Sequence, residues 1–209
     1  MKPNSTLRSY IESTIFPRYD HNDPGHGLSH IKAVIDRSFE LANFHNLHRL
    51  NPDIIYAAAS YHDIGCPIDR DHHEAISADI FLADDFMNKY FTKSQRTTIS
   101  HAITDHRASL GHTPRNTYGK LLSSADRTID LDDVLRRSYK WRLDLSDPDK
   151  IAESAYKHLV KKFGKESGYA TKAIYFSDGK YEQYLADLQQ LIADKSAYIA
   201  RLKKANGLV

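Results

Sequence analysis

Apolar residues recur at helical spacing along almost the whole chain, and no segment shows a convincing alternation of apolar and polar positions that would indicate a strand. Helices are predicted at about 5–16 and 28–44, from Pro52 to about Gly65, after Asp71, from Thr92 to about His106, from about Tyr118 onward, between Asp147 and Gly164, and at about 180–205. The pattern therefore predicts an all-α fold.

Capping signals support several of these boundaries. Asn51 and Pro52 suit the cap and the first position of a helix, and Pro17 should stop the helix that precedes it. Two spacings match a capping box: Asp71 with Glu74 and Thr92 with Gln95. The run IIYAAASYH after Pro52 is apolar nearly all round, so we expect this helix at the centre of the core.

No repeat, linker or low-complexity tract interrupts the chain, so we expect one compact domain over residues 1–209. A helical core at about 25–130 would be completed by C-terminal helices at 131–209. The segment from Glu166 to Gly179 fits either a short helix or an ordered loop.

Composition narrows the class of protein. Hydrophobic residues make up 41% of the chain and the formal net charge is +2, which does not favour a nucleic acid polymer or a membrane as partner. Cys66 is the single cysteine, which excludes an internal disulfide framework. Since the N-terminus has no apolar signal region and no stretch is long enough to span a bilayer, we expect a cytoplasmic protein. The sequence is compatible with a homodimer.

The chain contains 12 histidines, most of them in the first 112 residues. His62 and Asp63 are adjacent at the end of the apolar third helix. On its own such a pair is weak evidence for a site, because a buried His beside an Asp at a helix end is often a structural pair of the core. His30 shares a helix face with Val34 and Leu41, so its imidazole should point toward the core. A buried imidazole without a partner would be costly, so it should have one.

Asp126 also lies on an apolar helix face, four residues after Leu122 and three before Ile129. An inward carboxylate needs a cation or a hydrogen-bond network to stay charged. Two inward histidines and two inward aspartates satisfy one another best around a divalent metal, and imidazole with carboxylate suits Fe, Mn, Zn, Co or Ni.

These residues resemble the signature of the HD superfamily of metal-dependent phosphohydrolases: a His, then an adjacent His-Asp, then a distant Asp, all on helices. The pattern matches His30 in GLSHIKAV, His62-Asp63 in YHDIG and Asp126 in SSADR, over about residues 25–127. The resemblance implies an HD-type helical bundle, a metal centre at these four residues, and hydrolysis of a phosphate ester or anhydride through metal-activated water.

Two further histidines resemble the additional ligands of dinuclear HD branches. His73 lies in HHEAISA and His106 in HAITDH, and helical spacing places both on apolar faces, unlike His72 and His101. If both bind metal, the site holds two ions bridged by Asp63. The alternative is that His73 and His106 contact substrate or lie at the surface.

The residues that would act beside the metal are less well defined. Many HD hydrolases carry a Lys shortly after the His-Asp pair, where this chain has Cys66, which we interpret as a small packed residue. Arg70 could supply the missing positive charge, and Arg127 or Arg107 could offset charge that develops on phosphate. His26 lies one helical turn before His30 and fits a substrate contact at the rim, or simply a loop position.

The basic segment 136–142, RRSYKWR, allows two interpretations. Its arginines and aromatic rings could form a wall for a phosphorylated substrate. Alternatively it is an amphipathic helix with Tyr139 and Trp141 in the core and the arginines in water, which we favour.

The sequence therefore predicts a metal-dependent phosphohydrolase with one or two transition-metal ions and a small phosphorylated substrate, a nucleotide being one candidate. Two alternatives remain. The same ligand set serves dinuclear-iron oxygenases of the HD type, and a non-catalytic nucleotide-sensing HD module would keep the fold. Sensor modules usually lose a metal ligand, and none of the four core positions is missing here.

Overall fold

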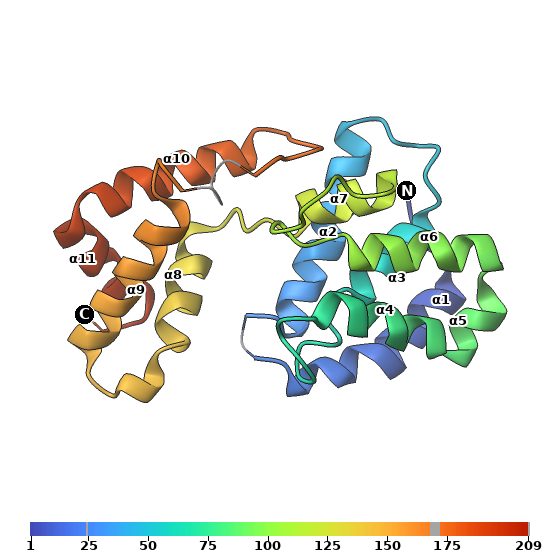
Figure 1. Cartoon of the computed structure of the whole chain (residues 1–209), viewed down its shortest axis with the longest axis horizontal. Helices are drawn as coiled ribbons and strands as arrows, with labels where there is room; N and C mark the ends of the chain where they lie inside the picture. Colours follow the sequence, from blue (N-terminus) through green and yellow to red (C-terminus); the bar gives the residue numbers. More distant parts are fainter. Residues whose placement is uncertain (24, 168–171, 209) are drawn as a thin grey trace. The chain divides into compact units, whose positions relative to one another are not determined.

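The structure, a computed structural model, describes residues 1–23, 25–167 and 172–208, and within these ranges it contains helices and no strands (Figure 1). This confirms the predicted all-α class. The helices of the first 126 residues are α1 Ser5–Tyr10, the π turn η1 Ile11–Ile15, the 3-10 helix η2 Phe16–His21, α2 Leu28–Phe44, α3 Pro52–Tyr61, α4 His73–Ala83, α5 Asp85–Tyr90, α6 Lys93–Thr104 and α7 Thr117–Ala125. Those that follow are α8 Leu131–Lys140, η3 Leu143–Leu145, α9 Pro148–Phe163, α10 Lys180–Ala193 and α11 Lys195–Ala205.

These helices form two compact units. The first comprises the described residues of Met1–Asp126 and the short segment Ile174–Ser177, and the second those of Arg127–Ala173 and Asp178–Val209. The expectation of one domain over residues 1–209 stays a prediction, which the cooperativity of unfolding would address.

Several predicted boundaries agree with the structure because their signals are local. α2 spans Leu28–Phe44, as the apolar spacing predicts. The Asn51 side chain accepts a hydrogen bond from the Asp53 amide at the start of α3. The Thr92–Gln95 capping box is present at α6. α9 begins after the Asp147 cap and ends at Gly164.

The first helix was predicted to stop at Pro17, and it changes its helical form there without helical structure coming to an end. A π turn and a 3-10 helix carry it on to His21, and Pro17 occupies the first turn of that 3-10 helix. Proline is tolerated in a first turn because the amide it lacks would have had no helical partner there.

The two long helices expected in the C-terminal half are each broken by an aspartate cap. α7 ends at Ala125 with Asp126 as its C-cap, and Asp130 caps α8 by accepting from the Asp133 amide. Asp194 separates α10 from α11 and accepts from the Ala197 amide. Helical spacing of apolar residues continues through both breaks, so periodicity alone did not reveal them.

The predicted Asp71 cap of α4 was also wrong. α4 begins after His72, and it is Asp69 that accepts hydrogen bonds from the Asp71 and His72 amides. In the segment expected to be a short helix or a loop, 166–179, the described residues form no helix before α10, and 168–171 lie outside the described residues.

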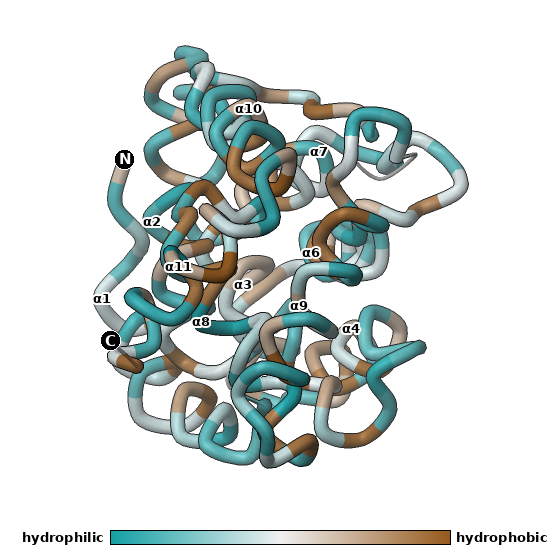
Figure 2. Tube along the Cα trace, turned by 90° about the vertical axis from the view of Figure 1, so that its left-hand side faces the viewer, coloured by the Kyte–Doolittle hydropathy of each residue, from teal (hydrophilic) through white to brown (hydrophobic). Residues whose placement is uncertain are grey.

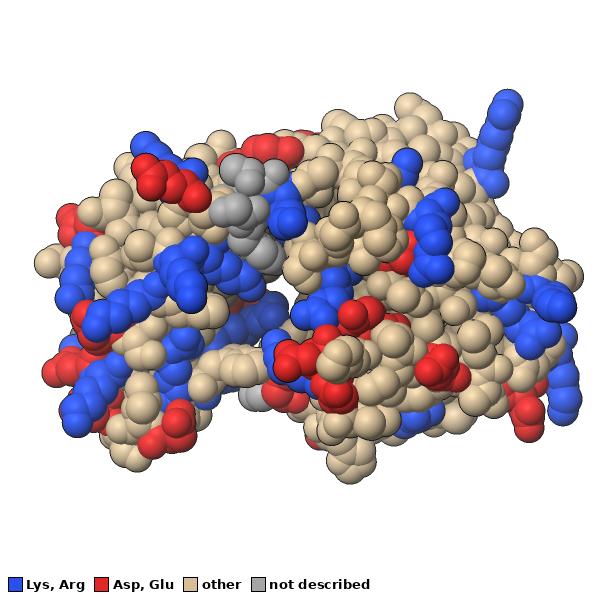
Figure 3. Space-filling view, in the orientation of Figure 1, with Lys and Arg blue, Asp and Glu red and all other residues tan. Residues whose placement is uncertain are grey.

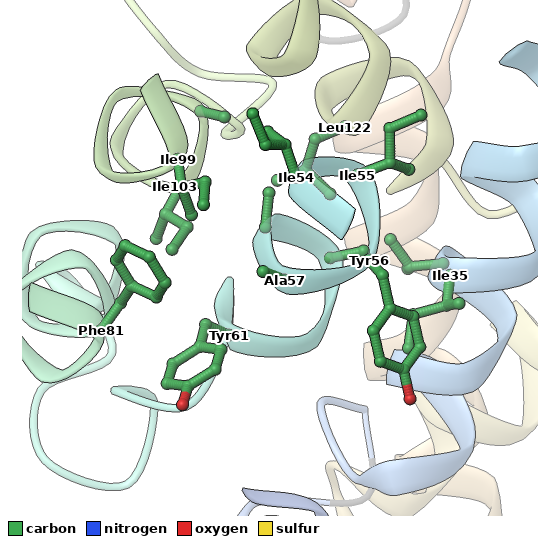
Figure 4. Packing of buried hydrophobic residues seen from close by; sticks show 14 of the residues in the cluster. Ile35, Ile54, Ile55, Tyr56, Ala57, Tyr61, Phe81, Ile99, Ile103 and Leu122 are labelled. Atoms are coloured by element: carbon green, nitrogen blue, oxygen red, sulfur yellow. The ribbon is translucent and has the colours of Figure 1, made fainter. Parts of the chain in front are cut away.

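α3 lies at the centre of the first unit, as predicted. Every residue from Ile54 to Tyr61 is buried, and α3 packs between α2, α6 and α7. Figure 4 shows its side chains spreading in several directions, with Tyr61 toward Phe81 and Tyr56 toward Ile35. Figure 2 shows hydrophobic and hydrophilic positions mixed along the other helices, and their buried residues recur at helical spacing, as Ile31, Val34, Ile35 and Leu41 do in α2.

In the second unit the interpretation of segment 136–142 as an amphipathic helix holds only in part. Tyr139 is 8% exposed, but Trp141 is 46% exposed, because side chains two positions apart in helical geometry point about 200° apart and so lie on opposite faces. Lys and Arg gather over parts of this unit, interspersed with Asp and Glu (Figure 3). Among the described helices, none combines the length and the hydropathy that a transmembrane span requires.

The loop between α6 and α7 is anchored by a buried carboxylate. Asp105, 1% exposed, accepts from the Arg115 backbone amide at 2.8 Å and from its guanidinium at 2.7 to 3.1 Å. Burial raises the pKa of Asp105, but the bonds from Arg115 outweigh this and the net pKa lies below its ordinary value. Asp105 directly precedes His106, so this anchor also fixes the end of α6.

We expect Asp105→Asn to lower the free energy of unfolding by roughly 1–3 kcal/mol at neutral pH, because a charged acceptor is lost from a buried position. The folded pKa lies below the unfolded value of about 3.9, so the stabilisation is complete above that pH and is lost as pH falls through the folded pKa. Urea titrations at pH 7 and pH 3 should show the difference from wild type shrinking in acid. Asp79→Asn, at an exposed position on α4, is the control; an equal loss in both variants would contradict the anchor role.

Candidate metal centre

Three helix C-termini and one helix N-terminus of the first unit meet at a cluster of histidines and aspartates. His62 and Asp63 follow the last residue of α3, His106 follows α6 and Asp126 is the C-cap of α7, while His73 opens α4. Helix C-termini carry partial negative charge, so their convergence favours a cation.

The Asp63 carboxylate lies at the middle of this cluster and is 2% exposed. Its Oδ2 atom is 3.4 Å from Nε2 of His30 and 3.3 Å from Nε2 of His62. Its Oδ1 atom is 3.2 Å from Nε2 of His73 and 3.5 Å from Nε2 of His106. Each carboxylate oxygen therefore faces a different pair of imidazoles.

Asp126 adds a second carboxylate on one side of Asp63. Its Oδ1 atom is 3.1 Å from Nε2 of His30 and 3.7 Å from Nε2 of His62. Three overlapping groups have ligand atoms within 4.8 Å of one another and could hold a metal ion: His30–His62–Asp63, His62–His106–Asp126 and Asp63–His73–His106.

Backbone carbonyls orient three of the imidazoles. The Nδ1 atoms of His62, His73 and His106 lie 2.8, 2.8 and 2.6 Å from the carbonyl oxygens of the residues three positions earlier. A carbonyl oxygen can only accept, so Nδ1 carries a proton, and in the neutral ring Nε2 presents a lone pair to the cluster. The carbonyls of Ala59 and Ile103 belong to the last turns of α3 and α6, where carbonyls can accept from side chains; that of Ile103 also accepts from the His106 amide at 3.5 Å.

The lone pairs that this arrangement creates have no donor. Nε2 of His30, Nε2 of His62 and Oδ2 of Asp63 are buried without a hydrogen-bond partner. Nε2 of His73 and Nε2 of His106 face each other at 3.3 Å, and in the neutral rings, whose single proton is on Nδ1, both are acceptors. Buried acceptors that point at one another are costly unless a cation lies between them.

The spacing of these atoms fits coordination to a common centre. Two ligand atoms, each about 2.1 Å from a metal, lie about 3.0 Å apart at a right angle and about 3.4 Å apart at the tetrahedral angle. The separations around Asp63, 3.2 to 3.5 Å, lie close to the tetrahedral value and are long for hydrogen bonds. The residues present therefore fit a transition-metal site.

The charges of the cluster hold its carboxylates ionised. Burial raises the pKa of Asp63, but His62, His106 and His30 outweigh it and hold that pKa well below its usual range. For Asp126, too, burial raises the pKa and the neighbouring imidazoles lower it by more. For His62 the balance is reversed: burial lowers the pKa, and the two carboxylates raise it well above the ordinary value.

Gly65 allows α4 to approach the turn that carries Asp63. A Cβ atom at this position would lie 2.8 Å from the His73 carbonyl oxygen and 2.9 Å from the Ile76 side chain. The Gly65 amide donates to the Ser77 hydroxyl at 2.9 Å, which ties the turn to α4. The glycine predicted only to end α3 thus also sets the distance between Asp63 and His73.

A polar network lies beside the cluster, and the sequence analysis missed two of its members, Asn22 and Asp23. Asn22 donates to the carbonyls of His26 and Asp63 at 2.8 and 3.0 Å. Asp23 accepts from Nδ1 of His26 at 2.9 Å and from Arg70 at 2.7 Å. The His26 ring lies edge-on to that of His30, with 5.8 Å between centroids. Turn-forming composition marked this loop, but nothing local indicated which side chains would reach Asp63.

The other residues singled out from the sequence have separate environments. Cys66 is buried, its pKa is raised by burial, and it is not part of any potential metal-binding group among the described residues. Arg107 donates to Glu74 and to the Asp71 carbonyl. Arg127 belongs to the second unit, where its guanidinium lies 5.8 Å from the centre of the Tyr181 ring.

Helical spacing selected the correct histidines for the interior. His73 is 8% and His106 is 2% exposed, whereas His72 is exposed and His101 is half-buried. The alternative of surface positions for His73 and His106 is therefore excluded.

Comparison with known proteins supplies one match. No curated protein and no solved structure matches the chain. The family model of the HD domain matches residues 27–136, a range that contains all six clustered residues. The general activity of that superfamily is metal-dependent phosphohydrolysis. Since the match covers more than half of the 209 residues, this chain belongs to the HD domain family.

Proposed function

We propose that this chain is a metal-dependent phosphohydrolase that acts on a small phosphate ester or anhydride and holds two transition-metal ions. The observation that carries the proposal is the position of Asp63, whose two oxygens face two separate pairs of imidazole nitrogens. A single ion would need only one of these oxygens.

The ligands divide between two positions. His30, His62, Asp126 and Oδ2 of Asp63 would hold one ion, and His73, His106 and Oδ1 of Asp63 the other. The mixture of imidazole and carboxylate suits Fe, Mn, Co, Ni or Zn. The second position has fewer protein ligands, which leaves more room there for water or substrate.

When bound, such ions lower the pKa of a coordinated water and polarise a phosphoryl oxygen. The protein contributes the ionised carboxylates of Asp63 and Asp126, whose two negative charges partly balance the metal charge. The carbonyls of Ala59, Arg70 and Ile103 fix the ring orientation of three histidines, which keeps their Nε2 atoms directed at the centre.

The polar network next to the cluster would orient the substrate. Arg70 is 45% exposed at its side chain and pairs with Asp23, so it can offer its guanidinium to a phosphate without being buried unpaired. His26, held by Asp23, lies beside His30 and would contact the leaving group or a phosphate oxygen. We also retain Arg127 as a residue that could offset charge on the substrate.

The first prediction concerns metal content. Protein purified without chelator should contain two metal ions per chain, and His73→Ala and His106→Ala should each reduce this to one at most, because each removes an imidazole from the same position. Elemental analysis with protein quantification measures the ratio.

His72→Ala and His101→Ala are the matched controls, since these histidines neighbour the proposed ligands and face away from the cluster. Their metal content should equal that of wild type. A ratio of one in wild type that is unchanged in all four variants would leave a mononuclear site.

A second prediction concerns activity. Wild type reconstituted with Mn²⁺, Fe²⁺, Co²⁺ or Ni²⁺ should release inorganic phosphate from at least one member of a panel of phosphomonoesters and nucleotides, and Asp63→Ala should release none because both metal positions lose a ligand. Asp69→Ala, an exposed nearby aspartate, should retain activity apart from a stability effect.

Two outcomes would overturn the hydrolase proposal. Full turnover in Asp63→Ala would show that the cluster is not the reaction site. Oxygen consumption by the iron-loaded protein together with no phosphate release would instead support the dinuclear-iron oxygenase. Nucleotide binding without turnover would support the sensor.

The third prediction concerns Asn22, which bonds the backbone carbonyl of Asp63. Asn22→Ala should weaken metal affinity by about tenfold or more, because a bond that orients a ligand-bearing turn is lost. Titration with Co²⁺, followed by its visible absorption, gives both the affinity and the ligand geometry. Asn88→Ala, on α5, is the control; equal Co²⁺ affinities in wild type and Asn22→Ala would argue against this role.

A further inference from the structure

A pocket of about 330 Å³ lies in the first unit between the N-terminal helical segment, α2 and α3. Its lining includes two cationic, two acidic and several aromatic side chains, among them Arg8, Glu12, Phe16, Lys32, Asp36 and Tyr56. None of these residues belongs to the clusters that could hold a metal.

One wall of the pocket is built on an uncommon backbone form. Residues 11–15 form a π turn, closed by a hydrogen bond from the Phe16 amide to the Ile11 carbonyl five residues earlier. Single π turns are rare and are frequent at functional sites. This turn carries Glu12 and leads into Phe16, and both line the pocket.

The floor of the pocket is apolar and aromatic. Phe16, Ile35 and Tyr56 are 6%, 7% and 4% exposed, and Phe39 also contributes. In Figure 4 the Tyr56 ring lies beside Ile35, with its hydroxyl directed away from the centre of the core. Burial, and then the Glu12 carboxylate, raise the pKa of Tyr56 to about 12, so its hydroxyl stays protonated and can donate to a ligand.

The rim of the pocket carries two cationic and two acidic side chains, of which one cation and one acid form an ion pair with each other and the other two do not. Arg8 and Glu12 bind each other at 3.0 Å. Lys32 and Asp36 lie one turn apart on α2, and neither has an ion pair with another described residue. The Lys32 ammonium lies 5.9 Å from the centre of the Phe16 ring, over the aromatic floor. An available ammonium and an available carboxylate thus flank one apolar surface.

The position of the pocket separates it from the metal centre. At about 100° per residue along a helix, Lys32 and Asp36 point about 200° and 240° around α2 from His30. A molecule in the pocket therefore contacts the opposite side of the helix that carries His30. It would be a second ligand rather than the substrate of the centre.

We propose that this pocket binds a free amino acid with an aromatic or large aliphatic side chain. Its carboxylate pairs with Lys32, its ammonium group pairs with Asp36, and its side chain packs on Phe16, Phe39 and Tyr56. Ligand pockets range from roughly 300 to 1,000 Å³, and a volume of about 330 Å³ suits a molecule of this size rather than a nucleotide. The proposal does not depend on the activity proposed for the metal centre.

The test is isothermal titration of the full chain with L-phenylalanine, L-tyrosine, L-leucine and L-methionine, with phenethylamine and 3-phenylpropionate as analogues that each lack one charge. At least one amino acid should bind saturably. Phenethylamine and 3-phenylpropionate should each bind about tenfold more weakly than L-phenylalanine, or worse, because each lacks one charge-assisted bond.

Lys32→Gln and Asp36→Asn should each weaken binding by about tenfold, while Lys93→Gln and Asp79→Asn, exposed positions outside the pocket, should not. Circular dichroism checks that the variants fold, as expected for exposed side chains. Three results would each overturn the proposal: no binding by any of the four amino acids, binding unchanged in Lys32→Gln and Asp36→Asn, or equal binding by the singly charged analogues.

Discussion

The first unit is organised around a carboxylate that water cannot reach. Asp63 is 2% exposed, and its charge must be balanced inside the protein. The structure surrounds it with four imidazole nitrogens at 3.2 to 3.5 Å, each from a different element or turn. In the neutral state three of these rings donate their single proton, on Nδ1, to a carbonyl, so they reach Asp63 as acceptors and cannot neutralise it by hydrogen bonding. A protein without a cation here would have to protonate the rings, and the same atoms are well placed to bind metal instead.

The helices of this unit are positioned to meet that requirement. α3, α6 and α7 end at the cluster, so their last carbonyls and their partial negative charges are directed toward it. Carbonyl groups in the last turns of α3 and α6 also accept hydrogen bonds from His62 and His106 and thereby orient these imidazoles. Close packing supports the arrangement: Gly65 lets α4 approach, Tyr19 donates to the Ser60 carbonyl from a fully buried position, and Asp105 holds the chain next to His106. Residues that hold the packing, such as Gly65 and Asp105, thus lie within two positions of residues that face the cluster, Asp63 and His106.

The sequence predicted the parts of this account that depend on local pattern. Helical spacing identified α2 and α3 and directed His30, His73 and His106 inward, because the side of a helix that a residue occupies follows from its position alone. It did not reveal the caps at Asp126 and Asp194, where the apolar spacing continues across the break. It also missed Asn22, whose bond to the Asp63 carbonyl spans 41 positions. The expectation that Tyr139 and Trp141 both lie in the core was wrong for Trp141, because side chains two positions apart on a helix point about 200° apart. Of these features, the Asn22 bond depends on a contact between distant segments, and no local signal encodes it.

We propose that Asp63 would bridge two metal ions. Anomalous diffraction from crystals grown with Mn²⁺, recorded on both sides of the manganese absorption edge, tests it directly. The account predicts two peaks, one among His30, His62 and Asp126 and one beside His73 and His106, with a different oxygen of Asp63 directed at each. A single fully occupied peak, or peaks that Asp63 does not contact, would contradict it.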